Sequence, residues 1–170
     1  NEFIVSVLKE LVANAQILHQ TGAQNYQAIE KLSRATLVDV SVQSEVKNRY
    51  KPVSYLEGKE MAYALSGADL VIGRAGSGTI FEIAAFGKPS ILVPLPEAAG
   101  DHQRENAYSY AKSGAASVLE EANFSTQIFL SQVNHILAKR EILDAMSASA
   151  LKFARPDSAR DIASLIFGLI

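Results

Sequence analysis

The sequence predicts an α/β fold, in which a Rossmann-like parallel sheet flanked by helices forms one domain over residues 1–170. Helical patterns alternate along the chain with short apolar runs, as they do when strands are joined through helices. Strands joined in this way are parallel, with right-handed crossovers. Apolar residues make up 48% of the 170-residue chain, enough to bury a substantial core.

Apolar periodicity and helix breakers place the elements along the chain. Strands are predicted at residues 15–19, 50–56, 69–73, 90–93 and 116–119. Helices are predicted at residues 3–13, 26–33, 59–65, 79–86, 104–112, 126–138, 141–152 and 158–168. The segment from 36 to 48 suits either an irregular strand or an extension of the preceding helix.

A ligand of such a sheet lies beyond the carboxyl ends of its strands. We therefore expect His19, Leu56, residues 74–79 and the loop 94–103 to lie along one rim. His19 could line a site there or be a packed, hydrogen-bonded residue.

Charge and composition exclude several classes of function. The net charge is −2 and the charged residues are interspersed, so nothing favours nucleic-acid binding. There is no cysteine, which excludes disulfides, thiolate metal sites and cysteine nucleophiles. No apolar run is long enough to span a bilayer, and no secretory signal is visible. The chain begins at Asn1 rather than Met, which suits a segment of something longer.

A glycine-rich turn lies between the strand 69–73 and the helix 79–86, with the sequence Gly73-Arg74-Ala75-Gly76-Ser77-Gly78-Thr79. Gly76 and Gly78 let backbone approach an anion, and the helix that follows offers unpaired N–H groups and a positive dipole end. Thr79 adds a hydroxyl and Arg74 a positive charge. This pattern favours a diphosphate site, although a tight turn that uses glycine for geometry alone remains an alternative. The turn lacks the Gly-Lys-Ser/Thr of a P-loop, and Phe81 stands where a dinucleotide fingerprint has its third glycine.

Two acidic residues near this turn are candidates for ribose binding. Glu82 could accept both ribose hydroxyls, or it could close a capping box with Thr79 and touch no ligand. Glu97 has the spacing of the ribose-binding acid of a dinucleotide site, but Pro94 and Pro96 intervene. A nicotinamide site is therefore not favoured.

Several polar residues admit a ligand role and a structural one. His102 is a candidate ligand in a polar loop, or an exposed residue before a helix; Asp101 could cap that helix, and Asn106 could hold the loop by bonding backbone. No function is assigned to His135. The apolar stripe of the last helix is interpreted as core or as an inter-domain face; it comprises Ile162, Leu165, Ile166 and Leu169.

Taken together, these motifs resemble one family over nearly the whole chain and in the same order. The chain is similar to the donor-binding C-terminal domain of the MurG-type glycosyltransferases, which transfer N-acetylglucosamine from UDP-GlcNAc to lipid-linked MurNAc-pentapeptide. That reaction converts lipid I to lipid II in peptidoglycan synthesis. The resemblance is carried by Ile17–Gly22, Ala68–Thr79, Glu82–Pro89, Ile91–Pro96, Asp101–Gln103 and Asn106–Ala107.

The resemblance implies the C-terminal half of a GT-B enzyme and gives roles to particular residues. Thr79, with Gly76, Ser77 and Gly78, would meet the diphosphate, and Glu82 would bind the ribose. Gln103, with His102, would bond the sugar hydroxyls, and the backbone near Leu56 would meet the uracil edge. Arg74 would lie beside the site. These nine residues are the substrate-binding set that we expect.

The resemblance also implies partners and a location. The acceptor domain, or an equivalent subunit, would supply the general base and bind the lipid-linked acceptor at the inner face of the bacterial membrane. We expect no cofactor beyond the donor substrate and no tightly bound metal, because no Asp-x-Asp or His/Asp cluster lies at the turn.

The chain departs from the family pattern in three ways. A Gly-Gly-Ser segment that precedes the first helix is absent, as is the acceptor domain, so this part alone is expected to be inactive. Residues 57–60 look longer than usual, which bears on the uracil assignment.

Three other functions are compatible with much of this pattern. The chain could be the UDP-GlcNAc-binding subunit of a two-chain lipid-linked GlcNAc transferase, half of a UDP-sugar epimerase, or a non-catalytic UDP-sugar sensor. Gly87-Lys88-Pro89 and Asp101-His102-Gln103 favour the transferase over the epimerase. The residues do not fix which UDP-sugar is bound.

Overall fold

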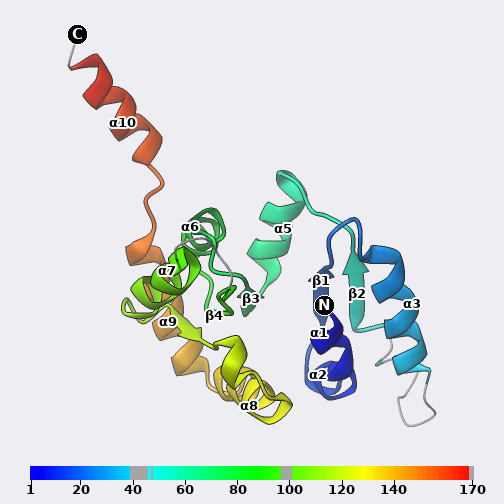
Figure 1. The fold of residues 1–170 in the computed structure, drawn as a ribbon. Helices are drawn as coiled ribbons and strands as arrows, with labels where there is room; N and C mark the ends of the chain where they lie inside the picture. The colour runs from blue at the N-terminus through cyan, green and yellow to red at the C-terminus, as the bar shows by residue number, and fades with distance from the viewer. Residues whose placement is uncertain (39–45, 47, 97–100, 169–170) are drawn as a thin grey trace. The chain divides into compact units, whose positions relative to one another are not determined.

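The computed structural model describes residues 1–38, 46, 48–96 and 101–168. The chain forms two compact units, Asn1–Ala64 and Leu65–Ile170, and each is described by itself (Figure 1). Parallel strands flanked by helices occur in both, so the predicted fold class is confirmed. That residues 1–170 form a single domain stays a prediction.

The first unit is built on a two-stranded parallel sheet. Strand β1 (Ile17–Gln20) pairs with β2 (Tyr50–Val53) in a register that places Ile17 opposite Tyr50 and Gln20 opposite Val53. The flanking helices are α1 (Glu2–Ser6), α2 (Leu8–Asn14) and α3 (Tyr26–Leu37).

The buried side chains of α2, α3 and β2 form the core of this unit. Leu8, Val12, Leu37 and Tyr50 cluster there. The predicted helix 3–13 is interrupted at Val7, whose φ of −108° and ψ of 13° leave the helical region. Helix α5 (Lys59–Gly67) then leads from the first unit into the second.

The second unit is built on a three-stranded parallel sheet in the order β3-β4-β5. These strands are β3 (Val71–Gly73), β4 (Ser90–Leu92) and β5 (Ala116–Val118). The central strand β4 is fully buried, as expected for a strand with neighbours on both sides. The carboxyl ends of β3, β4 and β5 meet at one edge, with Gly73 opposite Leu92 and Leu92 opposite Val118.

Helices surround this sheet at the positions that the sequence predicts, to within a few residues. The core contains Ile83, Ile91 and Phe129, and Tyr110 packs edge-on against Phe153 with ring centroids 4.8 Å apart. The helices are α6 (Ser77–Ala85), α7 (His102–Ala111), α8 (Thr126–Leu137), α9 (Arg140–Phe153) and α10 (Ser158–Phe167), with a 3-10 turn at Glu121–Asn123.

One interpretation of local structure is wrong, and another falls largely outside the described residues. Ile162, Leu165 and Ile166 of α10 are exposed, so the interpretation of this stripe as core is wrong for the described residues, and Leu169 lies outside them. The predicted irregular segment also falls largely outside the described residues, although α3 extends to Leu37. No helix among the described residues is long and apolar enough to cross a membrane.

Candidate functional site

Three loops meet at the carboxyl edge of the β3-β4-β5 sheet. Hydrogen bonds extend the strand pairing beyond the strands themselves: the N–H of Val93 donates to the carbonyl of Gly73 (2.8 Å), and that of Leu119 donates to Leu92 (2.9 Å). The loops that leave this edge therefore start side by side. They comprise residues 74–76, 93–96 and 119–121.

The glycine-rich turn ends at the N-terminus of α6. Gly76 is the N-cap residue, and no side chain among the described residues bonds the first amides of the helix. The first amide bonded within the helix is that of Ile80, which donates to the carbonyl of Gly76 (3.0 Å). The N–H groups of residues 77–79 precede it, and these three residues are exposed. The turn thus presents a row of amide donors and the positive end of a helix, which together favour an anion.

Gly76 and Gly78 have no structural need to be glycine. Neither has a positive φ, and Gly76 has an ordinary φ of −64°. A Cβ on Gly78 would meet nothing within 4 Å, and one on Gly76 would lie an ordinary 3.8 Å from the hydroxyl of Thr79. Gly87 differs, because its φ is 61° and a Cβ there would approach Leu151 to 2.8 Å. Glycine for turn geometry alone therefore does not explain Gly76 and Gly78.

Glu82 is exposed on α6, one turn beyond Thr79. The helix begins at Ser77 rather than at the predicted residue 79, so Thr79 is not the N-cap residue and no capping box with Glu82 forms. The capping interpretation of Glu82 is wrong for this reason. The carboxylate stays on the same side of the helix as Thr79, because residues three apart are neighbours on a helix.

Arg74 is held at the edge of the sheet by three acceptors. Its Nη1 donates to the carbonyls of Val93 (3.3 Å) and Pro94 (3.4 Å) and pairs with Oε1 of Glu121 (2.5 Å). Sequence reasoning missed Glu121. The signal that could have found it is its place just after strand 116–119, because that strand ends at the same edge as the strand before Arg74.

The start of α7 is hydrogen-bonded to the loops 74–76 and 93–96. This helix begins at His102 rather than at the predicted residue 104, so Gln103 lies in its first turn. The Oε1 of Gln103 accepts a hydrogen bond from the N–H of Leu95 (3.1 Å), and Nδ2 of Asn106 donates to the carbonyl of Ala75 (3.3 Å). Asn106 does bond backbone as expected, but the backbone is that of the glycine-rich turn rather than that of the loop before α7.

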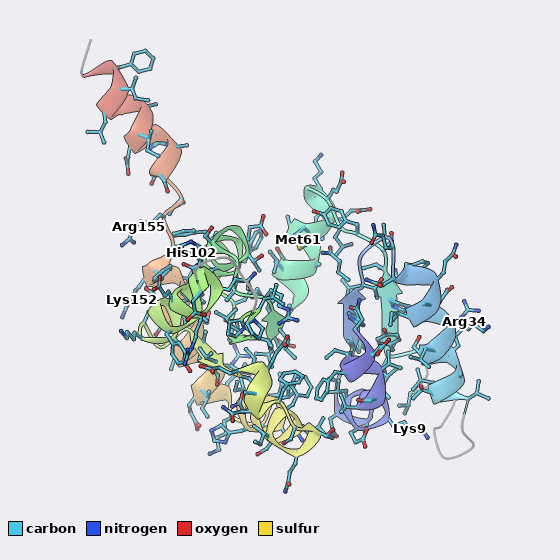
Figure 2. All side chains as sticks on the ribbon, in the orientation of Figure 1. Lys9, Arg34, Met61, His102, Lys152 and Arg155 are labelled. Atoms are coloured by element: carbon cyan, nitrogen blue, oxygen red, sulfur yellow. The ribbon has the colours of Figure 1, made fainter. Side chains whose placement is uncertain are left out.

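The two residues before Gln103 do not take part in those bonds. Asp101 is the N-cap residue in a left-handed conformation (φ 59°), but its side chain makes no cap bond and lies 3.7 Å from Arg104 instead. The predicted cap by Asp101 is therefore wrong. His102 is exposed at the start of α7 (Figure 2). Glu97 lies outside the described residues.

The first unit contains the remaining predicted residues, Leu56 and His19. Leu56 follows the end of β2, and its N–H donates to Oε1 of Gln20 (2.9 Å). His19 is partly buried, with Nδ1 2.9 Å from the hydroxyl of Tyr50 and Nε2 3.1 Å from Oδ1 of Asn1. Burial first, and then the N-terminal charge, lower the pKa of His19 to about 4. Its contacts are those of a packed residue.

The described residues offer no evident metal site. They contain no group of three or more His, Asp or Glu side chains arranged to hold a metal.

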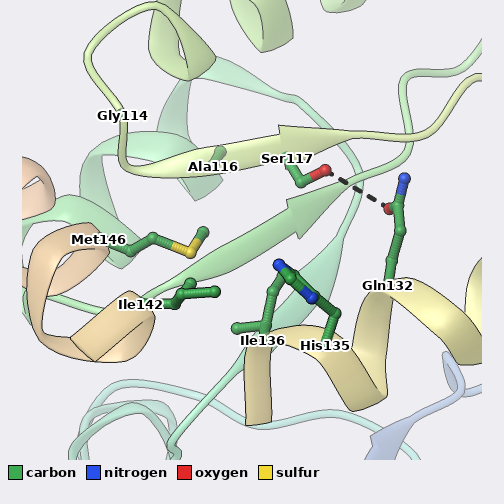
Figure 3. Close-up of a pocket in the computed structure, with 8 residues that line it drawn as sticks. All are labelled: Gly114, Ala116, Ser117, Gln132, His135, Ile136, Ile142 and Met146. Carbon is green, nitrogen blue, oxygen red and sulfur yellow. Dashed lines mark hydrogen bonds between the residues drawn. The ribbon is translucent and has the colours of Figure 1, made fainter. Parts of the chain in front are cut away.

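A hollow of about 270 Å³ lies between β5, α8 and α9, lined by Ser117, Gln132, His135 and apolar side chains (Figure 3). Gly114 and Ala116 place it at the amino end of β5, away from the edge where Arg74 lies.

Parallel strands, flanking helices and a glycine-rich turn at the carboxyl edge are features shared by many nucleotide-binding α/β proteins. Comparison with known families narrows this class. The profile of the glycosyltransferase family 28 C-terminal domain matches residues 1–162, and the chain belongs to this family.

Several relatives share one name, UDP-N-acetylglucosamine–N-acetylmuramyl-(pentapeptide) pyrophosphoryl-undecaprenol N-acetylglucosamine transferase. The protein of Stutzerimonas stutzeri is 35% identical over 97% of this chain and 44% of its own length. That of Listeria welshimeri is 33% identical over 100% of this chain and 44% of its own. The chain therefore spans somewhat less than half the length of these relatives.

Solved structures show the same fold. The crystal structure of Acinetobacter baumannii MurG superposes with a TM-score of 0.78 and 30% identity, over 98% of this chain and 46% of that one. The glycosyltransferase VinC gives a TM-score of 0.62 at 15% identity, over 88% of this chain and 31% of that one, and shows the fold alone. These likenesses confirm the predicted resemblance to the MurG-type family and to half of a GT-B enzyme.

Proposed function

We propose that this chain is the donor-binding domain of an inverting, UDP-GlcNAc-dependent hexosyltransferase that converts lipid I to lipid II in peptidoglycan synthesis. The observation that carries this proposal is the uncapped N-terminus of α6, where Gly76 and Gly78 leave space that no described side chain uses. The activity named for the Stutzerimonas and Listeria relatives supports the choice of donor and acceptor.

The diphosphate of the donor would lie against the amides of residues 77–79. These donors and the dipole of α6 are fixed before the reaction, so they oppose the negative charge that grows on the diphosphate as UDP leaves. Donors of this kind contribute a few kcal/mol each, about 10²-fold or more in rate. Thr79 would add its hydroxyl, and Arg74 its charge. We expect no tightly bound metal and no cofactor beyond the donor substrate.

The nucleoside and the sugar would be recognised by further residues of the chain. Glu82 would accept the two ribose hydroxyls, because its carboxylate is exposed and is not used to cap α6. Gln103 accepts from Leu95 through Oε1, which leaves its Nε2 as a donor for a sugar hydroxyl, with His102 beside it. The resemblance assigns the uracil contact to backbone near Leu56. Because Gln20 accepts from the N–H of Leu56, that contact would fall to the Leu56 carbonyl or to neighbouring backbone.

The proposal implies a partner and a location. An acceptor domain, or an equivalent subunit, would supply the general base and present the lipid-linked MurNAc-pentapeptide. The reaction would take place on the cytoplasmic side of the bacterial membrane, with the protein bound at its surface.

A transfer assay with the intact protein tests the proposed function. We expect UDP release from UDP-GlcNAc that depends on lipid I, and weaker binding of UDP-glucose in calorimetric titrations. Epimerisation of UDP-GlcNAc without an acceptor would instead support the epimerase. Transfer that needs a second polypeptide would support the two-chain enzyme.

A further inference from the structure

Glu121 is an acidic residue at the edge where the proposed donor site lies. It begins the 3-10 turn Glu121–Asn123 that follows β5. Strands β3 and β5 flank β4 in parallel, so their carboxyl ends lie at the same edge. This topology brings Glu121 to Arg74, at the start of the glycine-rich turn.

The Arg74 side chain has anchors that do not depend on Glu121. Its Nη1 donates to the carbonyls of Val93 and Pro94, which follow β4. The ion pair with Glu121 is the third interaction of the same nitrogen. Removing the Glu121 carboxylate therefore leaves two acceptors that keep the guanidinium at the edge of the sheet.

The Arg74–Glu121 pair is exposed to solvent. The side chain of Arg74 is 50% exposed and that of Glu121 is 40% exposed. Ion pairs with this exposure contribute little net stability, because water screens them and both side chains lose rotamer freedom. A diphosphate, which carries more charge and several acceptor oxygens, is a stronger partner for a guanidinium than one carboxylate is.

We propose that Glu121 is an exchangeable counter-ion of Arg74, displaced from it when a nucleoside diphosphate binds. Glu121 neutralises Arg74 when no diphosphate is present, and it competes with the diphosphate for the same guanidinium. It therefore weakens UDP binding and favours the release of UDP after transfer. This role rests on the proposed function, and Glu121 acts through Arg74 as a positioning residue.

Glu120, which precedes Glu121 in the chain, has different partners. Oε1 of Glu120 accepts from Nε of Arg104 (3.0 Å) and from the hydroxyl of Tyr108 (2.6 Å), both on α7. Tyr108 first, and Arg104 as well, keep the pKa of Glu120 below its ordinary value. Glu120 thus ties α7 to the end of β5, and Glu121 is the carboxylate that pairs with Arg74.

Calorimetric titration of UDP into the intact protein tests this role. We expect Glu121→Gln to bind UDP roughly two- to fivefold more tightly than the wild type, the range that an exposed ion pair allows. Glu105→Gln is the matched control, because it removes the same charge from an exposed position on α7. It should leave the affinity for UDP unchanged. Uridine, which has no phosphate, should bind equally to all three proteins.

The Arg74→Gln variant tests whether Glu121 acts through Arg74 or repels the diphosphate directly from a distance. With Arg74→Gln present, Glu121→Gln should change the affinity for UDP no further. An equal gain with and without Arg74, or an unchanged or weakened affinity in Glu121→Gln, would overturn the inference while leaving the proposed function standing. Failure of the wild type to bind UDP would overturn both.

Discussion

The carboxyl ends of the two sheets differ in how their polar groups are used. At the end of the β1-β2 sheet, polar side chains bond groups of their own unit. At the end of the β3-β4-β5 sheet, the amides that begin α6 have no side-chain cap among the described residues. In the first unit, Gln20 accepts from Leu56, and His19 contacts Tyr50 and Asn1. In the second, residues 77–79 are exposed and precede the first bonded amide of the helix. Both sheets are parallel, so topology alone does not mark a site. The difference lies in which edge leaves donors for a ligand.

Gly78→Ala should have the largest effect on ligand binding. A Cβ at this position meets open space and the backbone has no positive φ, so alanine is expected to stabilise α6 by about 0.5–1 kcal/mol. The same Cβ would stand where the diphosphate approaches the amides. We expect UDP affinity to fall by on the order of tenfold or more, the consequence of leaving a charged hydrogen bond unmade.

Thermal melting and calorimetric titration measure the two effects of Gly78→Ala. Gly67→Ala in α5 is the matched control, because a Cβ there also meets nothing within 4 Å. It should leave UDP affinity unchanged. Wild-type affinity in Gly78→Ala would show that the diphosphate does not approach this turn.

Glu82→Ala should weaken UDP binding by roughly tenfold, because a carboxylate that accepts two hydroxyls contributes about 1.5–3 kcal/mol. The stability of α6 should change little, since Glu82 does not cap the helix. Titration with 2′,3′-dideoxy-UDP gives the chemical control. If Glu82 binds the ribose, removing both the hydroxyls and the carboxylate should weaken binding no more than removing either one. If the two losses of affinity are additive, Glu82 makes some other contact.

The pH dependence of stability tests whether His19 is a packed residue of the first unit. Its imidazole stays neutral in the folded state down to a pKa of about 4, whereas in the unfolded chain it binds a proton near 6.5. The unfolded state therefore binds more protons between these values, so the free energy of unfolding should fall as pH drops from 6.5 towards 4. We expect a loss of about 1–2 kcal/mol once solvent screening of this half-buried group is included.

Denaturant unfolding at several pH values, with NMR titration of the imidazole, measures this effect. His19→Gln should remove that part of the pH dependence. An imidazole of His19 that titrates near 6.5 would contradict the packed role.

The hydroxyl of Tyr110 is a polar group in the core of the second unit, in contrast to the hydrogen-bonded polar side chains of the first. Its hydroxyl is buried with no hydrogen-bond partner among the described residues, and burial raises its pKa to about 12. Tyr110→Phe should raise the free energy of unfolding by about 1 kcal/mol, because it removes an unsatisfied group. Tyr108→Phe is the control: it removes a hydroxyl that bonds Glu120, so it should give no gain. Destabilisation by Tyr110→Phe would indicate a partner for the hydroxyl.

The strands and helices were predictable because their apolar periodicity and their glycine and proline boundaries are local. The turn at residues 73–79 was predictable for the same reason. The break at Val7 was not, because Phe3, Val7, Leu8 and Leu11 keep helical spacing across it.

Side-chain partners far apart in sequence were the part that sequence reasoning could not supply. The place of Glu121 after strand 116–119 indicates which edge it lies on but not its partner, because its pairing with Arg74 depends on the strand order β3-β4-β5. The pairing of Arg104 with Glu120 depends on how α7 packs against β5. The capping box at Thr79 and Glu82 matched a local pattern, but the helix began two residues earlier.

The most direct test of the account follows the amide resonances of the protein as UDP is added, with uridine as the control. We predict that UDP causes the largest chemical-shift changes at the N–H groups of Ser77, Gly78 and Thr79, and that uridine leaves these three resonances nearly unchanged. Binding of UDP that shifts amides elsewhere and leaves those of residues 77–79 in place would contradict the proposal that this turn holds the diphosphate.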